Sequence, residues 1–102
     1  MTQKQALEKV IGDIGYVSLK YLFVYNWLTD INWHEEAKQI AALAPKNENP
    51  TELEAYKADK SQAENMPHYF NKIFGFGTTT GDWKSGGSGQ AFVTELVDII
   101  NK

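Results

Sequence analysis

The sequence predicts an all-α protein, a compact bundle of four to five helices around a long N-terminal helix, folded as one helical domain over residues 1–102. Three observations favour this fold class. Apolar residues recur at helical spacing through the first third of the chain, several segments begin with helix-capping residues, and the last dozen residues are amphipathic. A chain of 102 residues with 42% hydrophobic residues is long and apolar enough for one hydrophobic core.

The N-terminal segment carries the strongest periodic pattern. Apolar residues recur there at alternating spacings of three and four, which indicates one face of a helix. The positions are Leu7, Val10, Ile14, Val17, Tyr21, Val24 and Leu28. We expect one helix from about Gln3 to Thr29, about 40 Å long at 1.5 Å per residue. Gly12 and Gly15 weaken it near its middle, and a kink and a chain reversal there are both compatible with the pattern.

Residues 16–28 also fit a second interpretation, in which they form a strand. Their apolar residues alternate as well as recurring at helical spacing, and β-branched and aromatic residues favour strands. The alternative fold class is therefore a small α+β domain. The helix is the preferred interpretation because the pattern begins in the helical QALEKV segment and the chain offers few partner strands.

Capping residues place the next two helices. Asn32, with Glu35 three residues later, predicts the start of a helix that reaches about Leu43. Pro50 suits the first position of a helix and predicts a mostly polar one that ends at about Glu64.

Two shorter apolar helices are expected after these. Pro67 opens the first of them, which ends before Gly75. The glycine-rich segment 77–89 has no helical or strand period and is expected to be a loop. The last helix, from about Gly89 to Asn101, has a clear apolar face. That face consists of Phe92, Val93, Leu96, Val97, Ile99 and Ile100.

Composition argues against several functional classes. The 10 basic residues are all lysine, against 13 acidic residues, and the net charge is -3. Nucleic acid is therefore not an expected partner, because phosphate and guanine are most often read by arginine on a basic surface. The absence of cysteine excludes disulfides, thiolate zinc sites, iron–sulfur clusters and a cysteine nucleophile. We expect no cofactor.

Two histidines each follow a carboxylate by four residues, His34 after Asp30 and His68 after Glu64. A metal site would require both pairs to converge, and each pair straddles a predicted helix start. We therefore expect no metal site. The sequence also contains no recognisable catalytic motif, so an enzyme is not expected.

The N-terminal segment does not resemble a signal peptide, because charged residues interrupt it from Lys4 to Asp13. The most apolar window, residues 16–28, contains polar residues and is too short to cross a bilayer as a helix. We expect a cytoplasmic protein without a membrane partner.

A second apolar stripe on the N-terminal helix is the main candidate site. It consists of Tyr16, Leu19, Phe23 and Trp27. One interpretation is a central helix that the others surround. The other is an exposed interface, because contiguous exposed aromatic residues mark binding surfaces. The second interpretation predicts a non-enzymatic protein–protein interaction module that binds another protein or itself as a homo-oligomer, with the size of an inhibitor, immunity or counter-defence protein.

The glycine-rich segment supports an alternative function, a small-ligand binder. Backbone N–H groups at the start of the last helix could hold an anion such as a phosphate or a nucleotide. The candidate residues are Lys84, Ser85, Gly86, Gly87, Ser88 and Gly89. The segment matches neither a P-loop nor a dinucleotide-binding turn, and a plain connecting loop is the preferred interpretation of it.

Overall fold

The computed structural model describes residues 3–46, 50–74 and 89–102, and these ranges contain five α-helices and no strand. The helices are α1 (Gln3–Gly12), α2 (Val17–Asp30), α3 (His34–Leu43), α4 (Pro50–Phe74) and α5 (Gly89–Ile100). The predicted all-α class is confirmed. The alternative strand over residues 16–28 is wrong, because this segment forms α2.

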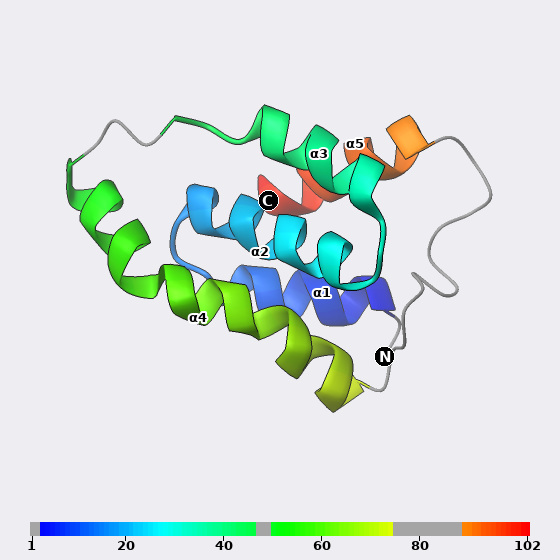
Figure 1. The fold of residues 1–102 in the computed structure, drawn as a ribbon, viewed down its shortest axis with the longest axis horizontal. Helices are drawn as coiled ribbons and strands as arrows, with labels where there is room; N and C mark the ends of the chain where they lie inside the picture. Colours follow the sequence, from blue (N-terminus) through cyan, green and yellow to red (C-terminus); the bar gives the residue numbers. More distant parts are fainter. Residues whose placement is uncertain (1–2, 47–49, 75–88) are drawn as a thin grey trace.

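The chain reverses between α1 and α2, so the predicted long N-terminal helix is wrong. Backbone N–H groups of Asp13 and Ile14 bond to carbonyls three residues earlier, at 3.2 and 3.0 Å, and close the last turn of α1. Tyr16 then adopts an extended conformation, with φ -123° and ψ 134°. Figure 1 shows α1 and α2 running in opposite directions.

The reversal has a physical cause in the two glycines. Gly12 and Gly15 are exposed, and a Cβ atom at either would meet nothing within 4 Å, so packing does not require glycine there. Each glycine instead lowers the helix propensity by about 1 kcal/mol relative to alanine. The chain can therefore leave the helix between them. Two shorter helices then place both apolar faces against one core.

Helix α2 lies at the centre of the bundle. It packs against α3 and α4 and also contacts α5, while α1 packs against α4 and α5, and α3 packs against α5. Figure 1 shows α3 and α4 on opposite sides of α2. The described parts of α3 and α4 make at most marginal contact with each other. The described parts of α3 and α4 therefore do not close over α2 between them, and we call this the open side of α2.

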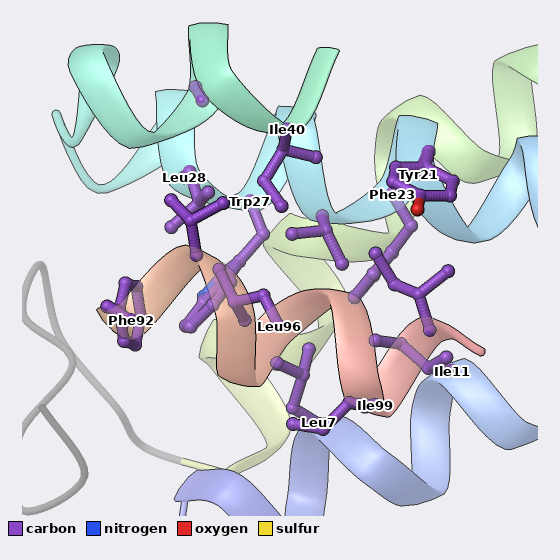
Figure 2. Close-up of a cluster of buried hydrophobic side chains, with 14 of the residues drawn as sticks. Leu7, Ile11, Tyr21, Phe23, Trp27, Leu28, Ile40, Phe92, Leu96 and Ile99 are labelled. Carbon is purple, nitrogen blue, oxygen red and sulfur yellow. The ribbon is translucent and has the colours of Figure 1, made fainter. Parts of the chain in front are cut away.

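The hydrophobic core draws side chains from all five helices (Figure 2). It contains Ala6, Leu7, Ile11, Tyr21, Phe23, Val24, Trp27, Leu28, Ile31, Ala37, Ile40, Phe70, Phe92, Val93, Leu96, Ile99 and Ile100. Burial of each large apolar side chain contributes about 1.5–3 kcal/mol. None of the described helices has the length and apolarity needed to span a bilayer.

Helix α4 is one helix of 25 residues, although the sequence predicts a break near Pro67. Pro67 is buried, and with Ala63 and Phe70 it forms a stripe at spacings of four and three that faces the core. Among the side chains described in residues 50–62, none is buried. The second half of α4 therefore anchors this helix, and its first half is largely exposed.

The turn between α2 and α3 differs from the predicted cap. Asn32 does not precede α3 directly, because Trp33 occupies that position. Asn32 instead has a left-handed conformation with φ 66° and ends α2. Its N–H bonds to the Thr29 carbonyl at 3.1 Å, and the Trp33 N–H bonds to the Leu28 carbonyl at 2.7 Å. These two bonds are those of a Schellman motif, in which glycine or asparagine is favoured at the left-handed residue.

This geometry makes Asn32 sensitive to the type of replacement. Asn32→Ala is expected to lower the free energy of unfolding by about 1 kcal/mol, because a Cβ-bearing residue without a local hydrogen bond is strained in the left-handed region. Asn32→Gly is expected to keep or raise the stability. Urea unfolding followed by circular dichroism measures both variants. Equal stability of the alanine and glycine variants would contradict the assigned turn.

Ion pairs join α1 to the C-terminal part of the chain. Lys4 Nζ lies 3.2 Å from Glu95 Oε1 of α5, and Lys102 Nζ lies 3.6 Å from Glu8 Oε1. These pairs are partly exposed, so each contributes at most about 1 kcal/mol. They nevertheless show that the first and last described helices lie side by side.

Candidate functional site

Three of the four predicted interface residues are buried, and the interface prediction is wrong for them. Phe23 is 0%, Trp27 1% and Leu19 4% exposed. The Phe70 ring on α4 packs edge-on against two aromatic rings of α2. Its centroid lies 5.5 Å from that of Trp27 and 6.3 Å from that of Phe23. Figure 2 shows Phe23 and Trp27 pointing from α2 into the core. The alternative interpretation, a central helix that others surround, holds for these side chains.

The open side of α2 contains a groove that the sequence pattern did not predict. We call it the tyrosine groove. It lies between α2 and the end of α3, with a volume of about 420 Å³. Its lining consists of Ser18, Tyr21, Leu22, Tyr25, Ala41, Ala44 and Pro45. Ser18, Leu22 and Tyr25 follow spacings of four and three, which align them along one strip of the helix.

The two walls of the tyrosine groove differ in size. Tyr25 is 37% exposed, and Leu22 is half-buried, so α2 supplies the large side chains. The α3 wall is made of alanines and Pro45, whose small side chains leave the space open. Among the described residues that line it, none has a charged side chain, and three of them carry a hydroxyl. Such a surface suits contact with apolar side chains and a few hydrogen bonds.

A second groove, which we call the aspartate groove, lies on the other side of the first turn of α2. Its volume is about 390 Å³. The turn between α1 and α2 contributes Asp13, Ile14, Gly15 and Tyr16, and α2 contributes Leu19. Helix α4 contributes Asp59, Gln62, Ala63 and Met66.

Two predicted interface residues therefore do meet in a groove. Tyr16 is half-buried and lies in the aspartate groove with Leu19. Ser18, the residue before Leu19, lines the tyrosine groove. The two grooves are consequently neighbours at the start of α2. Phe23 and Trp27 line neither groove.

The predicted anion site falls mostly outside the described residues. The residues that lie outside the described ranges are Lys84, Ser85, Gly86, Gly87 and Ser88.

The one described member of this predicted site, Gly89, begins α5. A Cβ atom on Gly89 would lie 2.7 Å from Glu36 Oε1. A carboxylate thus lies beside the positive end of α5, where it interacts favourably with the helix dipole and repels a second anion.

The histidines do not pair as their spacing suggested. His68 Nδ1 lies 3.5 Å from Asp30 Oδ1, which joins α4 to the end of α2 instead of joining residues four apart. In the described ranges no three histidine or carboxylate side chains gather closely enough to hold a metal ion. The Asp30–His68 pair is a link between two helices.

A sequence signal for the tyrosine groove does exist. Ser18, Leu22, Tyr25 and Thr29 share one face of α2, and two of them are polar, which is compatible with a partly exposed face. That signal marks the side that faces outward. It does not reveal that the alanines at the end of α3 lie beside this face.

Three comparisons with known proteins add no relative. No family model matches the chain, and no curated protein and no solved structure matches it at a significant level.

Proposed function

We propose that the protein is a non-enzymatic interaction module that binds another protein through the tyrosine groove. One observation carries the proposal. An apolar, tyrosine-bearing groove lies between α2 and the end of α3. Tyrosine concentrates binding energy in protein interfaces because it buries a large rigid surface and offers a hydroxyl. The occupant is a partner segment that inserts one or two apolar side chains, since about 420 Å³ holds no more.

This proposal fits the chemistry of the groove. Carbon and hydroxyl groups line the groove, and they provide contacts and hydrogen bonds. A module of this kind acts by covering a surface of its partner, as inhibitors, immunity proteins and counter-defence proteins do. We place the partner in the cytoplasm, because the chain has no cysteine and therefore lacks the disulfide framework that many small secreted domains carry.

Peptide selection tests the proposal. A random-peptide display library is panned on the purified protein, and the selected peptides are synthesised and titrated by calorimetry. Tyr25→Ala is expected to raise the dissociation constant about tenfold or more, because truncating a central aromatic contact costs about 2 kcal/mol. Tyr69→Ala is the matched control. Tyr69 is 62% exposed and lines neither groove, so this variant should bind as the wild type does.

Two outcomes contradict the proposal. Selected peptides that bind the wild type and both tyrosine variants equally would remove the groove from the interaction. Light scattering over a range of protein concentrations gives the other outcome. If the wild type forms a dimer that Tyr25→Ala dissociates, the groove binds a second copy of the chain and not a different protein.

A further inference from the structure

The aspartate groove combines negative charge with an apolar floor. Asp13 comes from the turn between α1 and α2, and Asp59 comes from α4, so two acidic residues from different elements line the same groove. Both residues are exposed. Leu19 and Met66, respectively buried and half-buried, supply carbon surface between these elements.

The charge of this groove is not neutralised within the described chain. The ion pairs there involve the carboxylates of Glu8, Asp30, Glu35, Glu64 and Glu95. Neither Asp13 nor Asp59 belongs to them. The groove is lined by no lysine or histidine. The chain as a whole has a net charge of -3, which adds to the negative potential.

The α4 wall of the groove stands on an anchored part of the bundle. Asp59, Ala63 and Met66 follow spacings of four and three, so they share one face of α4. Ala63 is buried, and the stripe that it begins continues into the core through Phe70. The Asp59 backbone therefore lies one turn from a packed position, although its side chain is exposed. This placement favours a defined site over a loose negative surface.

We infer that the aspartate groove binds a basic side chain of the partner protein, a lysine or an arginine. Its cationic group lies between the carboxylates of Asp13 and Asp59, and its methylene chain lies along Leu19, Met66 and the ring of Tyr16. The inference rests on the proposed function and specifies the partner's chemistry at the second groove. Charge complementarity identifies this occupant, and a volume of about 390 Å³ suits one long side chain with its neighbours.

A metal ion fits this groove less well. Magnesium and calcium require about six oxygen ligands in a close shell. The described residues contain no group of three or more metal-ligating side chains. The apolar floor would also contribute nothing to a hydrated ion, whereas it packs well against the stem of a lysine or an arginine.

The experiment uses the selected peptides and a double variant. Asp13→Asn with Asp59→Asn removes both charges while it keeps the shape of the side chains. For a lysine-bearing peptide, this double variant is expected to raise the dissociation constant about tenfold at low salt. The same peptide with norleucine in place of lysine should bind the wild type and the double variant equally. Asp98→Asn is the matched control, because Asp98 is an exposed aspartate on α5 outside both grooves.

Salt provides a second readout. Raising the sodium chloride concentration should weaken the wild type's binding to the lysine peptide and leave the double variant nearly unaffected. Unfolding curves of the double variant that coincide with those of the wild type show that the fold is intact. A double variant that binds the lysine peptide as tightly as the wild type overturns the inference.

The outcomes separate this inference from the proposed function. If selected peptides depend on Tyr25 but carry no enriched lysine or arginine, the proposed function stands and the inference fails. If basic peptides depend on both aspartates but not on Tyr25, the inference stands, and the tyrosine groove is not the binding site. If no peptide is selected, both fail.

Discussion

Replacing Trp27 with alanine is expected to lower the free energy of unfolding by about 3–5 kcal/mol. The Trp27 side chain is 1% exposed and packs edge-on against the Phe70 ring at 5.5 Å, so truncation leaves a large cavity in the centre of the core. Small domains have a total stability of about 5–15 kcal/mol, and this loss is a large part of it. Urea denaturation followed by circular dichroism measures the change.

The control for this variant lies on the same helix. Tyr25→Ala removes an aromatic ring that is partly exposed, and its stability is expected to fall by about 1 kcal/mol or less. A Trp27→Ala protein that remained as stable as the wild type would contradict the burial of this side chain. It would also restore the interpretation of Trp27 as a binding residue.

Replacing Phe70 with alanine is also expected to lower the free energy of unfolding by about 3–5 kcal/mol. The loss of stability is expected to fall on different helices. Phe70 contacts both Phe23 and Trp27, and it is the largest buried side chain described in α4. Its loss weakens the attachment of α4 to α2 most directly. Amide hydrogen exchange is therefore expected to accelerate more in the second half of α4 than in α5, because α4 opens first.

The neighbouring residue gives the control. Tyr69→Ala changes an aromatic ring that points to solvent, and a surface change of this kind alters stability by about 0.5 kcal/mol or less. Equal losses of stability in the Phe70→Ala and Tyr69→Ala variants would show that α4 does not pack as described. Uniform acceleration of exchange through all helices would show that α4 has no separate opening step.

The helical class could be predicted because the apolar spacing begins in the helical QALEKV segment and continues through residues 16–28, and because capping residues and the amphipathic last segment indicate further helices. The chain reversal before it could not, because Val10, Ile14 and Val17 keep the same three–four spacing across the turn. The spacing of apolar residues does not show whether the chain continues straight or reverses. A straight rod of about 40 Å would match the longest dimension of the molecule, which measures 40 × 27 × 23 Å, and part of its face would find no partner.

The continuity of α4 shows how packing overrides a local signal. Pro67 lacks an N–H group, so the carbonyl of Ala63 loses its helical partner, at a cost of about 3 kcal/mol. The sequence therefore indicated a helix end. Ala63, Pro67 and Phe70 are all buried along one stripe, and this burial offsets the cost.

The location of the groove could be predicted only in part. Helix α2 carries apolar residues on most of its circumference, and Phe23 and Tyr25 do not differ in residue class. Whether each of these side chains is buried depends on which helices flank α2. The sequence does not show that α3 and α4 make at most marginal contact with each other. Tyr16 and Leu19 line one groove, and the aspartates that share this groove come from separate segments of the chain.

The contact of α1 with α5 has a consequence for synthesis of the protein. Leu7 and Ile11 of α1 share a core with Leu96 and Ile100 of α5, which are more than 80 positions later in the chain. A ribosome releases the N-terminal part first, so the nascent chain exposes these apolar surfaces until α5 emerges. The part of the core that α1 and α5 share is therefore completed only after α5 is made. Until then, the growing polypeptide depends on rapid elongation or on chaperones to avoid aggregation.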